Sequence, residues 1–111
     1  MEKKDLLKDT IKHIDIKSYD STQLIDAMRD MSFTSRDTAR ATDILMMMVG
    51  EKECTNILTI AGSTSAAGCM QVYVDMVRNK MVDVVVSTGA SIIDMDLFEA
   101  LGYKHYKGHQ D

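Results

Sequence analysis

Two short stretches of small and hydroxyl-bearing residues hold the groups in this sequence that could do chemistry. Residues 62–65 read Gly-Ser-Thr-Ser, and residues 87–90 read Ser-Thr-Gly-Ala. Each stretch follows an apolar run and leads into a helical pattern, where the first backbone amides are free and carry partial positive charge. These amides and hydroxyl groups could bind a phosphate or a dinucleotide. The alternative is that both stretches are ordinary turns between a strand and a helix.

Neither stretch matches a standard phosphate-binding motif. The segment AGSTSAAG, residues 61–68, lacks the lysine of G-x-x-x-x-G-K-[ST] and does not contain G-x-G-x-x-G. The second apolar run ends in Ser-Thr-Gly, where a dinucleotide-binding fold usually has an acidic residue for the adenosine ribose. Any NAD site here would have an unusual sequence, and a small-phosphate site unrelated to NAD is a further reading.

Two carboxylates, Asp94 and Asp96, follow the second stretch. Beside a cofactor they could attract a cationic substrate such as a polyamine. They could also cap the following helix through its dipole, and the two roles are compatible. His105 and His109 have a spacing seen in zinc sites, but they lack neighbouring ligands, so no metal site is predicted. His13 has no evident partner in the sequence.

The elements that must position these groups follow from the spacing of the apolar residues. Capping patterns beginning at Asp20 and at Thr34 predict two helices, over residues 21–31 and 34–50. Two strands are predicted next, at residues 56–61 and 82–86, with a longer helix at residues 65–80 between them. A last helix is predicted from Asp94 onward.

Two apolar strands separated by one helix are typical of a βαβ crossover with parallel strands. The predicted fold is therefore α/β: a Rossmann-like βαβ unit preceded by two N-terminal helices. A parallel sheet of two strands is marginal by itself, so we expect it to be part of a larger doubly wound sheet. Ligands bind such folds beyond the carboxyl ends of the strands, where both small-residue stretches lie.

The chain divides into a charged leader (1–13), a helical segment (14–50) and a βαβα part (51–111), which together form one incomplete domain. The 111 residues carry a net charge of −4 with scattered basic residues, which argues against nucleic acid as a partner. There is no apolar stretch typical of a signal peptide or a membrane span. Cys54 and Cys69 form no CxxC pattern and are expected to be free thiols, so a cytoplasmic location is predicted.

Four segments of the chain resemble the N-terminal portion of deoxyhypusine synthase, and in particular its bacterial and archaeal deoxyhypusine-synthase-like branch. They read HIDIKSYDSTQLIDAM, SRDTARATDIL, LTIAGSTSAAG and MVDVVVSTGASIIDMDLFEALGYKHYKG, and the resemblance extends over residues 13–108. It implies a Rossmann-type NAD enzyme that forms a homotetramer with active sites between subunits. Members oxidise spermidine with NAD and transfer its 4-aminobutyl group, through a lysine imine, to a lysine of the hypusine-bearing translation factor or to another amine.

The resemblance also assigns residues by position. Asp94 falls where the family has an acidic residue near the polyamine, with Asp96 as the alternative because the local register is shifted. The family's catalytic lysine lies in its C-terminal part, and Lys104 and Lys107 match no catalytic motif, so no catalytic residue is expected in this chain. The implied cofactor-binding residues are Gly62, Ser63, Thr64, Ser65, Ala66, Thr88, Gly89 and Ala90. The alternative function is a non-catalytic nucleotide-binding or subunit-association module derived from the same fold.

Overall fold

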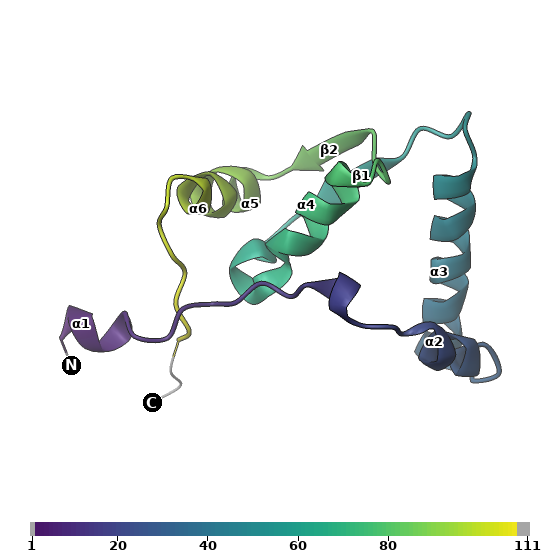
Figure 1. Cartoon of the computed structure of the whole chain (residues 1–111), viewed down its shortest axis with the longest axis horizontal. Coiled ribbons are helices and arrows are strands. Elements are labelled where there is room, and N and C mark those ends of the chain that lie inside the picture. Colours follow the sequence, from purple (N-terminus) through teal and green to yellow (C-terminus); the bar gives the residue numbers. More distant parts are fainter. Residues whose placement is uncertain (1, 109–111) are drawn as a thin grey trace.

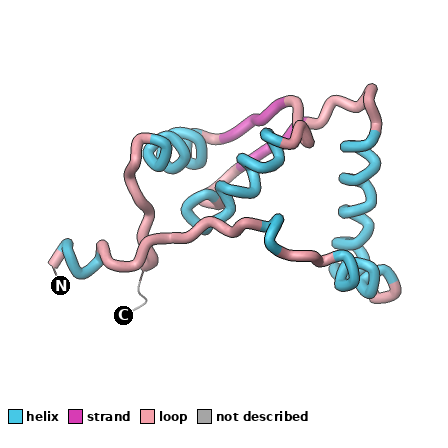
Figure 2. The backbone as a smooth tube through the Cα atoms, in the orientation of Figure 1, coloured by secondary structure: helices cyan, strands magenta, loops and turns pink. Residues whose placement is uncertain are grey.

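The computed structural model describes residues 2–108, which form an elongated body measuring 50 × 31 × 23 Å (Figure 1). Helices α2 and α3 pack together at one end, apart from the two-stranded sheet and the helices beside it (Figure 2). The elements in chain order are α1 (Lys3–Leu6), a 3-10 turn (Ile16–Ser18), α2 (Thr22–Arg29), α3 (Phe33–Gly50), β1 (Ile57–Ile60), a helical segment (Ser65–Cys69), α4 (Met70–Arg78), β2 (Val84–Ser87), α5 (Gly89–Ser91), a helical segment (Ile92–Leu97) and α6 (Phe98–Ala100).

The sheet has the predicted parallel topology. Strands β1 and β2 pair in register from Ile57 with Val84 to Ile60 with Ser87, and α4 connects them. The α/β class, with helices before two parallel strands, is therefore confirmed. Both strands end at the same edge of the sheet, which is the edge where the two small-residue stretches begin.

The two N-terminal helices form where predicted, but their N-terminal contacts differ from the expected caps. Before α2, the side chain of Asp20 accepts a hydrogen bond from the Thr22 amide at 2.9 Å, but the N-cap residue is Ser21, which makes no side-chain cap bond. Helix α3 begins already at Phe33 and has Ser32 as its N-cap residue, without a side-chain cap bond. The predicted cap at Thr34 is wrong because that residue lies inside the helix, where its carbonyl accepts a hydrogen bond from the Thr38 hydroxyl.

The helix predicted over residues 65–80 is broken near its start. Gly68 has a φ of 100°, so the helical segment Ser65–Cys69 and α4 meet at a kink. Glycine adopts this left-handed conformation without the steric cost that a Cβ atom brings. The Gly68 carbonyl leaves the helical pattern and accepts a hydrogen bond from the Ile14 amide at 2.9 Å.

The last helical region begins earlier than predicted. The Thr88 carbonyl accepts hydrogen bonds from the amides of Ser91 and Ile92, so the chain turns into a helix at Gly89 rather than at Asp94. Asp94 and Asp96 therefore lie within the helical segment Ile92–Leu97. Asp94 is the acidic residue in the first turn of this segment, as a favourable interaction with the helix dipole requires, whereas neither carboxylate is an N-cap residue.

The two faces of the sheet have different surroundings. Ile60 and Val85 face α4 and help to line the space between α4 and the last helical region, and they are 8% and 38% exposed. The opposite face carries Ile57, Val84 and Val86, which are 57%, 42% and 55% exposed. Helices in this part of the chain therefore lie against one face and cover it in part, and that face positions the candidate site.

Candidate functional site

The two predicted loops meet at the carboxyl ends of β1 and β2. The amide of Thr88 donates a hydrogen bond to the carbonyl of Ile60 at 3.2 Å, so the chain leaves both strands at adjacent points. Gly62 then turns the first loop with a φ of 80°. The structure thus brings residues 62–66 and 88–90 to one edge of the sheet.

Two buried side chains of the last helical region hold the first loop in place. The hydroxyl of Ser91 donates a hydrogen bond to the carbonyl of Gly62, and the sulfur of Met95 accepts one from the amide of Ala66 at 3.2 Å. Ser91 is 0% and Met95 5% exposed. Sequence reasoning missed both residues, although their spacing of four places them on one face of a helix and was a usable signal.

The predicted cofactor-binding residues differ in what they offer to a ligand. The Thr64 hydroxyl accepts a hydrogen bond from the Tyr73 hydroxyl at 2.8 Å. Ser65 is 2% exposed, and its hydroxyl has no hydrogen-bond partner within residues 2–108. The Ala66 amide is already bonded to the sulfur of Met95. The exposed members of the set are Gly62, Ser63, Thr88, Gly89 and Ala90.

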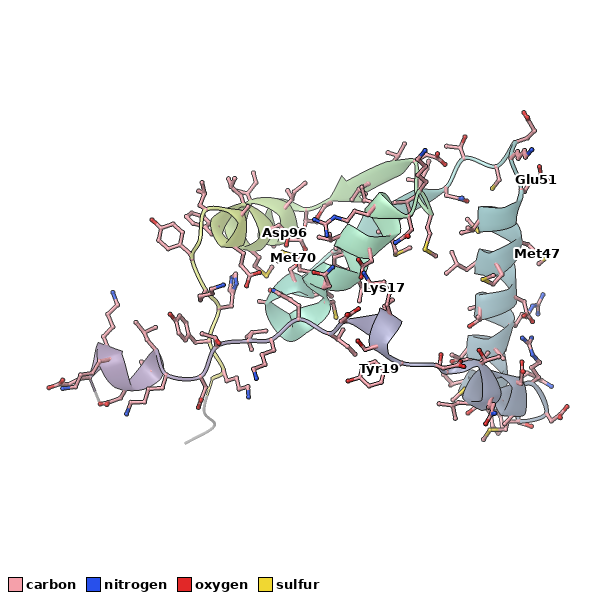
Figure 3. All side chains as sticks on the ribbon, viewed as in Figure 1. Lys17, Tyr19, Met47, Glu51, Met70 and Asp96 are labelled. Carbon is pink, nitrogen blue, oxygen red and sulfur yellow. The ribbon has the colours of Figure 1, made fainter. Side chains whose placement is uncertain are left out.

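The two predicted substrate carboxylates, Asp94 and Asp96, lie in different surroundings. Asp94 is exposed, whereas Asp96 lines a cavity of about 690 Å³ between α4 and the last helical region. Met70 lines the same cavity from α4 (Figure 3). One oxygen of Asp96, Oδ1, is buried and lacks a hydrogen-bond partner in the described part of the chain. The structure therefore places Asp96, but not Asp94, on the wall of this cavity.

A carboxylate between two histidines is the second feature that sequence reasoning missed. The Nε2 atom of His13 lies 2.6 Å from Glu99 Oε2, and the Nδ1 atom of His105 lies 3.1 Å from Glu99 Oε1. Burial acts to raise the pKa of Glu99, but the hydrogen bonds from His105 and His13 outweigh it and hold that pKa below its usual value. The prediction that His13 has no partner is wrong, because its partner is distant in the sequence.

Several other expectations concern metals, thiols and membranes. No group of three or more His, Cys, Asp or Glu side chains within residues 2–108 could hold a metal ion, and His109 lies outside the described residues. Cys54 and Cys69 are free thiols, as predicted. Within the same range, none of the helices combines the length and apolar character needed to cross a membrane.

The fold and the position of the loops define an α/β protein of the class that places ligands at the carboxyl ends of parallel strands. Comparison with known families then makes the assignment specific. The family model described as deoxyhypusine synthase matches residues 23–111, and the chain belongs to this family. The resemblance found in the sequence is therefore confirmed.

Individual relatives agree with this assignment. The deoxyhypusine synthase-like protein of Caulobacter vibrioides is 60% identical over 106 residues, which cover 96% of this chain and 29% of that protein. The protein of the same name from Chlorobaculum tepidum is 51% identical over 99% of this chain and 31% of its own length. A probable deoxyhypusine synthase 2 of Methanosarcina acetivorans is 36% identical, over 86% of this chain and 27% of its own length.

The chain spans about 30% of the length of the curated relatives that it matches. No solved structure gives a significant match.

Proposed function

We propose that this chain supplies the N-terminal half of the NAD site of a deoxyhypusine-synthase-type aminobutyl transferase. The reaction is the NAD-dependent transfer of a 4-aminobutyl group from spermidine to a protein lysine or another amine. The observation that carries the proposal is the junction of the two loops at the strand ends, held by the hydrogen bond from Ser91 to Gly62. Family membership supports the reaction class.

The residues at this junction fit a dinucleotide phosphate. No described atom lies within 4 Å of the position that a Cβ atom would take on Gly62 or on Gly89, so a ligand can approach the backbone closely at both points. Ser63 and Thr88 add exposed hydroxyl groups. Small side chains, free amides and hydroxyl donors are the usual environment of a bound pyrophosphate.

NAD, when bound, supplies the hydride acceptor for oxidation of the polyamine and returns the hydride later. The residues of this chain bind and orient the reactants. Gly62, Ser63 and Thr88 hold the phosphates, and Asp94 and Asp96 attract the ammonium groups of the polyamine because opposite charges raise its local concentration. The imine-forming lysine comes from outside this chain, and a homo-oligomer of the cytoplasmic enzyme completes the site between subunits. The acceptor is the hypusine-bearing translation factor or another amine.

A calorimetric titration of NAD into the chain, with and without spermidine, tests the proposal. The matched variants are Gly62→Ala and Gly50→Ala, since an added Cβ meets no described atom at either position and only Gly62 has a positive φ. We expect saturable binding to the parent chain and to Gly50→Ala. Gly62→Ala should bind about tenfold more weakly, because a left-handed alanine costs about 1–2 kcal/mol and disturbs the loop.

Absence of binding to a chain shown by circular dichroism to be folded would refute a half-site that binds NAD without the rest of the enzyme. That result would favour the alternative of a subunit-association module, for which the exposed sheet face around Ile57 and Val86 is the supporting observation. Equal affinities of the two glycine variants would refute the role of the 62–66 loop in particular.

A further inference from the structure

Residues 10–17, here called the N-terminal strap, run across two separate elements of the body (Figures 1 and 3). Backbone amides attach it at two points: the Ile11 amide donates to the His105 carbonyl at 2.8 Å, and the Ile14 amide donates to the Gly68 carbonyl at 2.9 Å. At its end, Lys17 Nζ donates to Asp75 Oδ1 on α4 at 2.8 Å. The strap therefore links the C-terminal segment to α4.

The Lys17–Asp75 bond is a firm attachment for the end of the strap. Asp75 is 4% exposed, so removal of its partner would leave a buried carboxylate without a cation. The hydrogen bond from Lys17 lowers the pKa of Asp75, which shows that the charged form is the one stabilised. This end of the strap is set by an ion pair that persists at neutral pH.

The middle of the strap depends on Glu99. Side-chain exposures of 18% for His13, 11% for Glu99 and 24% for His105 make this a largely buried cluster. A carboxylate only accepts hydrogen bonds, so both imidazoles must donate, His13 from Nε2 and His105 from Nδ1. The single carboxylate thereby joins the strap, α6 and the C-terminal segment.

This cluster also forms part of a cavity wall. His13 and Glu99 both line the cavity between α4 and the last helical region. The other charged side chains on that wall are Arg78, Asp96 and Lys104. A displacement of His13 would therefore open the cavity at the side that the strap covers.

We propose that the N-terminal strap is a releasable closure of this cavity and that Glu99 is its latch. While Glu99 is ionised, its two oxygens hold the strap and the C-terminal segment on α6. When the charge is lost, residues 10–14 detach while Lys17 still anchors the far end. The inference does not rest on the proposed NAD chemistry, because it uses only contacts among the strap, α4 and α6.

The pH dependence of the latch has a definite sign. Because the pKa of Glu99 is lowered in the folded chain, its contribution to stability is present above the ordinary glutamate pKa of about 4.3 and is lost as pH falls through the lower folded value. An imidazole donates a hydrogen bond whether it is neutral or charged. The strap should therefore remain closed at neutral pH and should open only as the pH falls through the lowered pKa of Glu99.

Amide hydrogen exchange of the whole chain tests this proposal. The reporters are the amides of Ile11 and Ile14, and the reference is the amide of Met81, which bonds to the Met76 carbonyl next to Asp75, at the end of the strap that is expected to stay attached. We expect Glu99→Gln to lower the protection factors of Ile11 and Ile14 at least about tenfold and to leave Met81 unchanged. The matched control is Glu53→Gln, an exposed glutamate at which we expect no change.

NMR that distinguishes the two ring nitrogens of each histidine adds a second measurement. The parent chain should show protonated Nε2 on His13 and protonated Nδ1 on His105 at pH 7, and Glu99→Gln should lose this fixed pattern in both rings. Unchanged protection of Ile11 and Ile14 in Glu99→Gln would overturn the latch. An equal loss of protection at Met81 would also overturn it, because that result would indicate unfolding of the whole chain rather than release of the strap.

Discussion

Ser91 and Met95 contact the same loop from one face of a helical region. Ser91 is fully buried, and its hydroxyl is bonded to the Gly62 carbonyl. Met95 is bonded through sulfur to the Ala66 amide. A buried polar group that loses its partner costs more than the bond itself contributes, so such contacts define one loop conformation. At the scale of single residues, these two side chains link the first loop to the second.

Replacement of Ser91 by alanine tests this link. The change removes the hydroxyl donor and leaves the Gly62 carbonyl with one partner fewer. We expect a loss of about 1 kcal/mol in the free energy of unfolding and a weaker affinity for NAD. Urea unfolding and calorimetry measure the two effects, with Ser35→Ala on α3 as the control. If Ser91→Ala and Ser35→Ala behaved alike in both measurements, the link would have no influence on the loop.

The kink at Gly68 affects how α4 and the N-terminal strap are arranged. It separates the loop-bearing segment Ser65–Cys69 from α4 and frees a carbonyl for the strap. An added Cβ atom at Gly68 would lie 3.0 Å from the Lys12 carbonyl oxygen. Both the backbone conformation and the close approach of the strap therefore require glycine at this position.

Gly68→Ala and Gly102→Ala separate these two requirements. Gly102 also has a positive φ, 95°, but an added Cβ atom there meets no described atom within 4 Å. We expect Gly102→Ala to cost about 1 kcal/mol in the free energy of unfolding and Gly68→Ala to cost about 2–4 kcal/mol, because the clash adds to the strain. Urea unfolding of both variants measures the difference. Equal costs would mean that the strap moves aside without penalty.

The molecule as a whole has a sheet with one partly covered and one uncovered face. The described residues bury only a few apolar side chains, among them Ile60 and Met95. Parallel strands are ordinarily covered on both faces. This chain spans about 30% of the length of its relatives. In this chain, we expect substitutions on the face that α4 covers to lower stability more than substitutions on the opposite face.

A pair of substitutions on β1 measures the contribution of each face. Ile60→Thr introduces a hydroxyl at a position that is 8% exposed, and we expect a loss of about 2–3 kcal/mol in the free energy of unfolding. Ile57→Thr changes a side chain that is 57% exposed, and the expected change is within about 0.5 kcal/mol. Comparable losses in the two variants would show that the outer face is also covered in solution, by self-association.

Prediction from the sequence succeeded where local chemistry decides structure. The β-branched run at residues 82–86 indicated a strand, and the structure has β2 at Val84–Ser87. Gly50 ended the second predicted helix, as it ends α3. The two glycine- and hydroxyl-rich stretches were placed at the strand ends, where the structure also has them. In each case the deciding interaction lies within a few residues along the chain.

Prediction failed where the deciding partner is distant in the chain. At the break near Gly68, the Gly68 carbonyl is bonded to the amide of Ile14, more than fifty residues away in the chain. The pairing of His13 with Glu99 joins residues at opposite ends of the sequence. A contact between residues so far apart cannot be predicted from periodicity or local propensity.

The sequence by itself determined the α/β class, the two parallel strands, the small-residue loops and the family. The first three follow from patterns of side-chain type, which depend on backbone propensity and on alternation between apolar and polar positions. The family follows from the resemblance of four segments of the sequence. Only the tertiary structure decided that Ser91 and Met95 hold the first loop, that Asp96 rather than Asp94 lines the cavity, and that Glu99 binds both histidines. The physical reason is that burial and hydrogen bonding depend on which segments meet in space.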